Sequence, residues 1–397
     1  MKVLIVIPYI GSVYGGTSKS VSELANGLGS LGIQVDLITT NANGPDKLDV
    51  PLKTWIEHQS YRIKYFPCWH RYDQTFSPSL LYWTFRHLHE YDLVHSHTLF
   101  SPMLLSIVHW QCRLKQMPYL MSPHGMLEPW ALHNKANKKR RYFQYVEQPA
   151  LQHAQALQVL TAAEANNLHQ LNLLRTVQVP NGIDQHLFTA LPEPEAFYQA
   201  FPSTRGKRIL LFLSRIDAKK GLDLLASAFA QVHQNFPDLH LVIAGPNSTG
   251  FLPTVENYFA ELGCLDSVTF TGMLNGDLKY AALAAAELYI LPSYSEGFSM
   301  SVLEGMAAGL PCIITTGCNF PEAQEADAAC VVDINAEAIV TALKDCLESP
   351  QQAADMGMRG QQLILQNYTW EQSASKLLQV YTSIVDAETS NKSLSHV

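Results

Sequence analysis

The amino-acid sequence lacks several features that would assign it to a class at once. No stretch of its 397 residues approaches the run of about 18 apolar residues that a membrane-spanning helix needs, so we expect no such helix. The seven cysteines form no Cys-x-x-Cys pair and no zinc-binding spacing, which favours reduced thiols in a cytosolic protein. Lysine and arginine number 27 against 35 aspartates and glutamates, and this net charge of −8 argues against a dedicated nucleic-acid-binding protein.

A secretory leader and low-complexity tracts are also not evident. The opening apolar run, residues 3–7, is short and no cleavage site follows it, so we predict a first strand there. Hydrophobic residues make up 47% of the chain and charged residues 16%, which is enough apolar material for two buried cores. This composition excludes a disordered chain, a disulfide miniprotein and a collagen-like repeat.

Short apolar runs alternate with segments of helical periodicity along the chain. Strands that are apolar throughout and separated by helices indicate parallel sheets covered on both faces, the doubly wound α/β architecture. The pattern breaks at residues 186–207, which hold three prolines and indicate a linker region with one short helix, and then restarts. We therefore predict two domains, residues 1–185 and 186–368. The predicted strands are residues 3–7, 35–39, 93–94, 119–121 and 156–160 in the first domain and 209–214, 239–244, 268–270, 288–291 and 312–315 in the second.

One stretch of the first domain is strongly basic. Residues 113–141 hold seven lysines and arginines against a single acid, Glu128, and aromatic residues follow at positions 142, 143 and 145. A basic stretch beside aromatics is typical of contact with an anionic membrane surface. A solvated helix face gives the same pattern, so the sequence leaves both interpretations open.

A glycine-rich loop follows the first predicted strand. It covers residues 11–18 and opens a helix. Gly15 and Gly16 allow a ligand to approach the backbone, and free N–H groups at a helix N-terminus favour anions. The spacing matches neither the dinucleotide fingerprint nor the Walker phosphate loop, so a plain strand-to-helix turn is the alternative.

The second domain places two cations after its first predicted strand. Arg215 follows that strand directly, and Lys220 lies just before the next helix. The carboxyl ends of parallel strands face the crevice in which such folds bind ligands. A guanidinium and an ammonium together suit a diphosphate, whereas a solvated charged loop is the simpler alternative.

Two glutamates flank the start of a later helix. Glu296 lies on the loop after the strand predicted at residues 288–291, Ser299 is the expected N-cap, and Glu304 follows within the helix. One acid can accept hydrogen bonds from sugar hydroxyls, the intervening amides can hold a phosphate, and the other acid can bind a ribose diol. His124 of the first domain likewise follows a predicted strand, at the carboxyl edge of that sheet.

The motifs and their order along the chain resemble those of the retaining glycosyltransferases of family 4, also called group 1. The resemblance covers nearly the whole chain, and residues 122–132 look like members that build bacterial surface polysaccharides. It implies the GT-B fold, in which two Rossmann-like domains face each other across a cleft. It also implies a final helix, here residues 369–388, that returns to the N-terminal domain. The motifs that carry the resemblance are Gly15-Gly16, residues 180–184, Arg215 with Lys220-Gly221, Ala244-Gly245 and the Glu296–Glu304 pair.

The resemblance implies a role for each charged group. Arg215 and Lys220 would bind the donor diphosphate and offset the charge on the leaving group. Glu296 would contact the donor sugar, and His124 would lie beside the transferred sugar. These four are the predicted catalytic residues, whereas Glu304 would bind the donor through its ribose hydroxyls.

The remaining predicted donor-binding residues act through their backbone. The resemblance implies that the amides of Gly297, Phe298 and Ser299 lie near the sugar and phosphate, and that Gly15 and Gly16 leave room near the phosphate and acceptor. The Asp-x-Asp metal signature is not found beside these motifs, and the family generally needs no divalent ion. We therefore expect no metal and no cofactor beyond the donor itself.

The implied reaction moves a hexose from a nucleotide-diphosphate sugar to a carbohydrate or lipid-linked acceptor hydroxyl, with retention at the anomeric carbon. We expect a cytoplasmic enzyme of surface polysaccharide or glycolipid synthesis that binds no nucleic acid. Peripheral contact with the inner face of the membrane would run through residues 113–141. The alternatives are a sugar-nucleotide epimerase or a phosphorylase on the same fold, or a non-catalytic scaffold protein.

Overall fold

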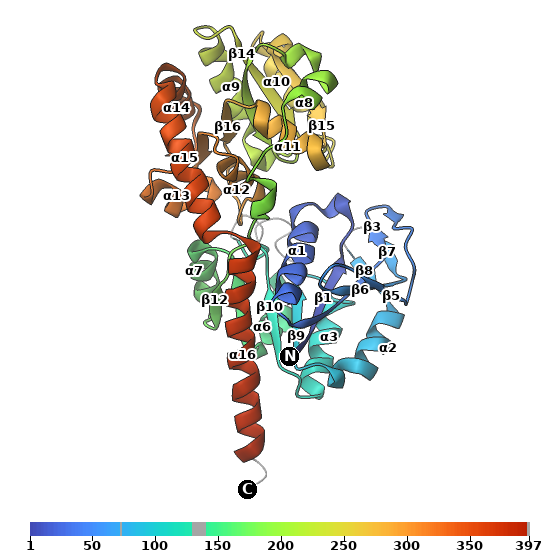
Figure 1. Cartoon of the computed structure of the whole chain (residues 1–397). Helices are drawn as coiled ribbons and strands as arrows, with labels where there is room; N and C mark the ends of the chain where they lie inside the picture. Colours follow the sequence, from blue (N-terminus) through green and yellow to red (C-terminus); the bar gives the residue numbers. More distant parts are fainter. Residues whose placement is uncertain (72–73, 129–139, 395–397) are drawn as a thin grey trace. The chain divides into compact units, whose positions relative to one another are not determined.

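The computed structural model describes residues 1–71, 74–128 and 140–394, and the chain forms two compact units (Figure 1). Unit 1 comprises Met1–Gly182 together with Trp370–Val397, and unit 2 comprises Ile183–Thr369. Each unit is built on a mainly parallel sheet with helices between its strands, which confirms the predicted α/β class. None of the helices described is both long and apolar enough to cross a membrane.

Unit 1 contains a sheet of eight strands in the order β12-β11-β10-β9-β1-β2-β6-β5. Neighbouring strands are parallel except for the edge pair, where β5 runs antiparallel to β6. The central strand β1 is apolar on both faces, and Val3, Leu4 and Ile5 are fully buried. The strands are β1 (Lys2–Tyr9), β2 (Gln34–Thr40), β5 (Trp55–Glu57), β6 (Arg62–Phe66), β9 (Leu93–His97), β10 (Tyr119–Ser122), β11 (Ala156–Val159) and β12 (Thr176–Gln178).

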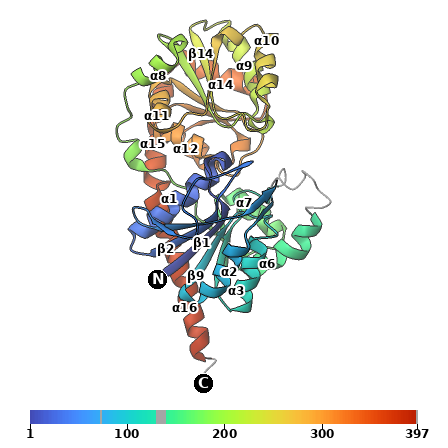
Figure 2. The same ribbon diagram turned by 90° about the vertical axis from the view of Figure 1, so that its right-hand side faces the viewer.

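The helices of unit 1 pack in pairs. Helix α1 (Gly16–Ser30) lies against the C-terminal helix α16 (Trp370–Leu394), and α2 (Pro78–His87) lies beside α3 (Leu105–Leu114) (Figure 2). Close approach of α1 to α16 depends on Gly27, because a Cβ there would lie 3.2 Å from the Trp370 carbonyl oxygen. The other helices of this unit are α6 (Gln148–His153) and α7 (Ala162–Gln170).

Unit 2 contains six parallel strands in the order β15-β14-β13-β16-β17-β18. The strand order reverses between β13 and β16, and such a switch point opens a crevice at the carboxyl ends of the two strands. The strands are β13 (Arg208–Leu213), β14 (Leu239–Ala244), β15 (Val268–Gly272), β16 (Leu288–Leu291), β17 (Cys312–Thr315) and β18 (Cys330–Val332). The helices are α8 (Glu195–Ala200), α9 (Leu222–His233), α10 (Leu252–Glu261), α11 (Gly276–Ala285), α12 (Met300–Ala307), α13 (Pro321–Glu325), α14 (Ala336–Glu348) and α15 (Pro350–Asn367).

The proline-containing segment at residues 186–207 contains one short helix, as the sequence indicated, but it packs against unit 2 and is not a free linker. It holds α8, and Phe197 of this helix is fully buried in the core of unit 2. Pro194 precedes α8 and Pro202 follows it, and a helix of six residues is too short to show a clear period in the sequence. The segment therefore contributes to packing in unit 2.

Candidate functional site

The site in unit 2 begins at a tight turn after β13. In the 3₁₀ turn η6 (Ala218–Lys220), Asp217 Oδ1 accepts a hydrogen bond from the Lys219 amide at 3.0 Å. Gly221 then takes the left-handed conformation with φ 66°, and a Cβ there would lie 2.0 Å from the Pro292 carbonyl oxygen. A glycine is therefore required for this turn to lie against the loop that follows β16.

Lys220 and Glu296 meet where these two loops touch. The Lys220 ammonium lies 2.6 Å from Glu296 Oε1, and both residues are more than nine-tenths buried. Ser293 Oγ donates a second hydrogen bond to the same oxygen at 2.5 Å. The pair brings together two predicted catalytic residues from the ends of β13 and β16, which are the strands at the switch point.

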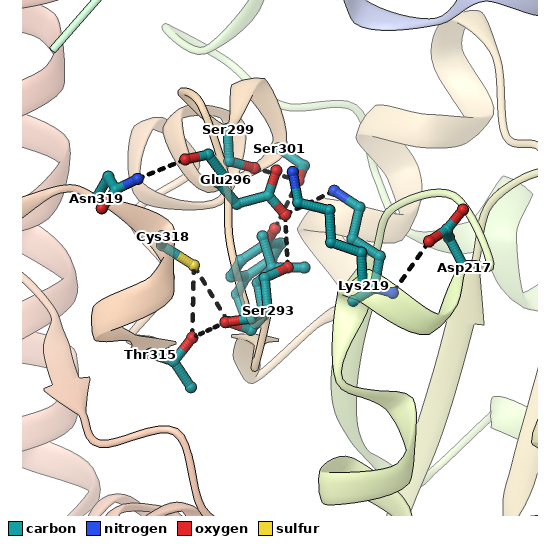
Figure 3. Close-up of polar contacts among 12 residues, drawn as sticks. Asp217, Lys219, Ser293, Glu296, Ser299, Ser301, Thr315, Cys318 and Asn319 are labelled. Atoms are coloured by element: carbon teal, nitrogen blue, oxygen red, sulfur yellow. Dashed lines mark hydrogen bonds and ion pairs between the residues drawn. The ribbon is translucent and has the colours of Figure 1, made fainter. Parts of the chain in front are cut away.

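The loop that carries Glu296 is held from the β17 side (Figure 3). Asn319 Nδ2 donates to the Glu296 carbonyl at 2.5 Å, and the Glu296 amide donates to the Gly317 carbonyl at 2.7 Å. Thr315 Oγ1 donates to the Ser293 carbonyl at 2.5 Å. These contacts to Thr315, Gly317 and Asn319 hold the backbone of the loop in the position that places the Glu296 carboxylate beside Lys220.

Glu304 lies in α12 and also has a cationic partner. Lys279 Nζ, from α11, is 2.7 Å from Glu304 Oε1, and the two side chains are 14% and 10% exposed. The sequence did not single out Lys279, because nothing within its own segment marks it as a partner of residue 304. The second glutamate is thus fixed by a residue 25 positions away.

The first turn of α12 has no side-chain cap. Ser299 is the N-cap residue, as predicted, but its hydroxyl pairs with Ser301 Oγ at 3.1 Å and makes no capping hydrogen bond. Amides at an uncapped helix start are available to an anion. The Phe298 ring packs on Phe320 and Tyr368, so the donor contact that we predict for Phe298 would be made by its backbone.

Arg215 differs from the other predicted residues of unit 2. It is exposed, and its side chain has no ion pair with any part of the chain that the structure describes. Placed after β13, it lies on the same carboxyl edge as Lys220. An unpaired exposed guanidinium keeps its donors for a ligand.

Gly15, Gly16 and His124 belong to unit 1. Gly15 has φ 76° and open space around a Cβ position, and Gly16 begins α1. His124 is half-buried two residues after β10, with φ 54°, and its Nε2 lies 2.9 Å from Nδ1 of the buried His97. Burial lowers the pKa of His124 to about 4, so its ring is neutral at pH 7.

Part of the basic stretch at residues 113–141 lies outside the described residues, including Lys135, Lys138 and Lys139. Of the rest, Arg113, Arg140 and Arg141 are exposed. Four large side chains in or near this stretch and in α2 are also exposed. These side chains are Trp110 at 58%, Leu114 at 59%, Tyr145 at 73% and Phe85 at 43%.

The carboxylates and histidines of the described residues form no metal-binding cluster. Within residues 1–71, 74–128 and 140–394, no three histidine, cysteine, aspartate or glutamate side chains are gathered in a way that suits a metal ion. The two carboxylates of the site each face a lysine instead.

Two family models match the sequence. The model described as "Glycosyl transferases group 1" matches residues 195–363, and the model described as "Glycosyltransferase Family 4" matches residues 14–187. Together they cover most of both units. Their boundary falls close to the division between the units.

Individual proteins show the same relationship. A GDP-mannose-dependent α-(1-6)-phosphatidylinositol monomannoside mannosyltransferase of Mycolicibacterium smegmatis is 28% identical over 51% of this chain and 55% of its own, about half of each. The O-antigen chain mannosyltransferase C of Escherichia coli is 23% identical over 96% of this chain and 97% of its own. The structure of Anabaena HepE in complex with UDP-glucose superposes with a TM-score of 0.76 and 17% identity, covering 96% of this chain and 100% of that one.

Proposed function

The chain belongs to the group 1 glycosyltransferases of GT-B fold, and from this premise we propose that it moves a hexose from a nucleotide-diphosphate sugar to an acceptor hydroxyl with retention of anomeric configuration. The observation that carries the proposal is the contact of Lys220 with Glu296 at the switch point of unit 2. A cation and a sugar-binding carboxylate are needed side by side where a diphosphate meets its sugar. The names of the relatives, GDP-mannose in one and UDP-glucose in another, support a donor of this class.

In the proposed complex, Lys220 and Arg215 bind the diphosphate. Negative charge grows on the leaving diphosphate as the glycosidic bond breaks, and cations already in place stabilise that charge. The uncapped amides at the start of α12 add further donors. With this much positive charge available from the chain, the reaction needs no divalent ion.

The hydrogen bonds of Glu296 bear on the route by which retention would be achieved. A double displacement requires a carboxylate that is free to attack the anomeric carbon. Glu296 instead accepts hydrogen bonds from Lys220 and Ser293, which lowers its nucleophilicity and suits it to hold sugar hydroxyls. We therefore favour attack by the acceptor on the face that the diphosphate leaves, with the leaving phosphate taking the acceptor proton.

The acceptor is proposed to be a carbohydrate or a lipid-linked glycan of surface polysaccharide or glycolipid synthesis. The names of the relatives, an O-antigen chain mannosyltransferase and a phosphatidylinositol monomannoside mannosyltransferase, support this class. The exposed apolar side chains Trp110 and Leu114, next to Arg113, support peripheral contact with an anionic membrane.

Acceptor-dependent release of nucleoside diphosphate tests the reaction. A thermal-shift panel of UDP-, GDP- and ADP-sugars first selects the donor, since a donor at 100 times its dissociation constant stabilises the fold by about 2.7 kcal/mol. Transferase activity requires that the diphosphate appears when acceptor is added. Interconversion of the sugar nucleotide without acceptor would identify an epimerase, and no stabilisation by any donor would indicate a scaffold protein.

Vesicle co-sedimentation tests the membrane contact. We expect binding to vesicles with anionic phospholipid and not to vesicles of neutral phosphatidylcholine. A Trp110→Ser/Leu114→Ser variant should reduce the bound fraction several-fold. Leu262→Ser, at an exposed site of unit 2, is the matched control. Equal binding by both variants would remove this surface from the proposal.

A further inference from the structure

Two histidine rings share a hydrogen bond at the carboxyl edge of the unit 1 sheet. His97 is the last residue of β9 and is fully buried, whereas His124 is half-buried beyond the end of the neighbouring strand β10. Their ring centroids are 5.2 Å apart, and His97 Nδ1 lies 2.9 Å from His124 Nε2. Because both atoms of this contact are nitrogens, one of the two rings must donate its proton to the other.

The protonation of both rings is restricted by their surroundings. Burial lowers the pKa of His97 well below its usual value and that of His124 to about 4, and His95 beside them adds to the effect on His97. Glu164, the acid bonded to the Gly125 amide, is itself buried with a raised pKa. Each ring therefore carries one proton at neutral pH. The shared bond has two arrangements, with the proton either on His97 Nδ1 or on His124 Nε2.

The second ring nitrogen of His97, Nε2, shows which of these two arrangements is present. His97 Nε2 is buried and finds no hydrogen-bond partner among the described residues. If His124 donated, His97 would have to carry its proton on Nε2, as a buried N–H without an acceptor. Such orphaned donors are rare and cost more than a lone pair left unused. His97 therefore carries its proton on Nδ1 and donates it to His124 Nε2.

The third histidine of this cluster cannot reverse that assignment. Ser122 uses its one proton to donate to Gln158 Oε1 at 2.7 Å, so the 2.6 Å contact between His95 Nε2 and Ser122 Oγ requires His95 to donate. His95 Nδ1 then accepts from the Tyr381 hydroxyl at 2.6 Å. Both nitrogens of His95 are occupied, which leaves His97 as the ring that sets the state of His124.

We propose that His97 is a positioning residue that fixes His124 as the tautomer protonated on Nδ1, so that the half-buried ring offers a neutral N–H donor to a hydroxyl of the bound sugar. The identity of that ligand as a sugar rests on the proposed function, whereas the tautomer does not. A neutral N–H donor suits an uncharged hydroxyl, whereas a protonated ring would favour an anion. The second nitrogen of a histidine commonly sets the role of the first in this way.

The tautomer can be read directly by ¹⁵N-edited NMR of the histidine side chains in the full chain, with His124→Gln used to assign the signals. In the unmodified protein at pH 7.5 we expect the Nδ1–H pattern for His124. An Nε2–H pattern for His124 would overturn the proposal without any variant of His97.

Two substitutions of His97 then test whether this residue sets the tautomer of His124. The side-chain amide introduced by His97→Asn can still donate from near the Nδ1 position, so His124 should keep the Nδ1–H tautomer. His97→Leu removes the donor, and His124 should shift to a mixture of tautomers. His109→Leu removes another buried histidine of unit 1, which is hydrogen-bonded to Ser96, and should leave the His124 signals unchanged. An unchanged His124 tautomer in a folded His97→Leu variant would overturn the proposal.

Turnover separates this inference from the proposed function. With the donor found in the thermal-shift panel, His97→Leu should lower kcat at least tenfold, and His97→Asn should stay within about threefold of the unmodified enzyme. If the tautomers behave as expected but no variant and no unmodified protein transfers sugar, the proposed function fails and the tautomer assignment stands. If the unmodified enzyme is active and His97→Leu matches it, His97 has no positioning role in the reaction.

Discussion

At the scale of single residues, Lys220 and Glu296 depend on each other. Both are buried, so removing one charge leaves the other without a counter-charge in a poorly solvated site. We predict that Glu296→Gln lowers the free energy of unfolding by about 3 kcal/mol, as found when one partner of a buried ion pair is lost. Urea denaturation of the ligand-free protein measures this change.

A second substitution checks the cause of that loss. If the cost arises from an unpaired ammonium, then Lys220→Met added to Glu296→Gln should restore part of the stability, although not the activity. Glu337→Gln, at an exposed site of unit 2, should change the unfolding free energy by less than about 0.5 kcal/mol. Additive losses in the double variant would contradict the coupling.

Unlike Glu296, Arg215 should contribute to activity and hardly at all to stability. Because its side chain is exposed, we predict that Arg215→Ala leaves the melting temperature nearly unchanged. Turnover should fall by at least 100-fold, since a donor aimed at developing charge contributes about 3 kcal/mol to the transition state. Steady-state kinetics with the selected donor measures it, and near-normal turnover would contradict the assignment.

What the sequence reveals at this scale depends on distance along the chain. Arg215, Lys220 and Glu296 were predictable because each follows a strand, and that placement is local. The partners of Glu304 and His124 were not predicted: Lys279 lies 25 residues from Glu304, and His97 lies 27 from His124. Such pairs are set by which strands become neighbours, and no single segment records that order.

At the scale of elements, helix α16 makes a buried polar contact with the sheet of unit 1 inside an apolar interface. Tyr381 is fully buried and donates to His95. We predict that Tyr381→Phe costs about 1–2 kcal/mol of unfolding free energy, because His95 Nδ1 is left buried without its donor. Chemical denaturation measures this, and Tyr198→Phe, at a half-buried site of unit 2, is the control. A neutral Tyr381→Phe would show that this hydrogen bond does not help to hold α16.

The predictability of elements followed their burial. Strands buried on both sides, such as β13 and β14, were evident as apolar runs. Four strands of the two sheets were missed: β5, β6, β12 and β18. Of these, β6 is an inner strand, but Arg62 and Lys64 interrupt its apolar run. β18 is half-buried throughout, and β5 is a short antiparallel strand with one exposed residue, so neither has a clear apolar period. Sheet edges carry a weaker pattern because they have fewer neighbours to pack against.

At the scale of the whole molecule, buried neutral histidines should make the fold sensitive to acid. Burial lowers the pKa of His95 and His109 to about 3 and that of His124 to about 4, whereas in the unfolded chain these groups titrate near 6.5. The unfolded chain therefore binds more protons below pH 6.5. We predict that stability is greatest above this pH and falls as the pH drops toward 4, by up to about 1.4 kcal/mol per pH unit for each histidine.

Urea denaturation at a series of pH values from 7.5 to 4.5 measures that slope. His109→Phe should reduce it by the share of one histidine, since the ring stacks on Tyr119 and a phenyl group can take its place. A slope that is the same in this variant would indicate that other groups cause the acid sensitivity.

The fold class was predictable at this scale because alternating strands and helices admit few arrangements. The short helix expected within residues 186–207 is present as α8, but its packing into the core was not predicted. Prolines mark the end of regular structure, but they do not show whether an irregular segment packs. Burial of Phe197 decided that point, and burial follows from the three-dimensional neighbours of a side chain.

The position of α16 in unit 1 has a consequence for biosynthesis. Ala374, Leu377 and Tyr381 of this helix are fully buried within a unit whose other part ends at Gly182. On the ribosome, residues 1–182 emerge early but must wait for their last helix until all of unit 2 has been translated. Unit 2, although made later, is contiguous and can complete its core first. While unit 2 folds, the apolar surface of unit 1 that α16 will cover stays exposed on the nascent chain. We therefore expect the first half of the chain to depend on chaperones.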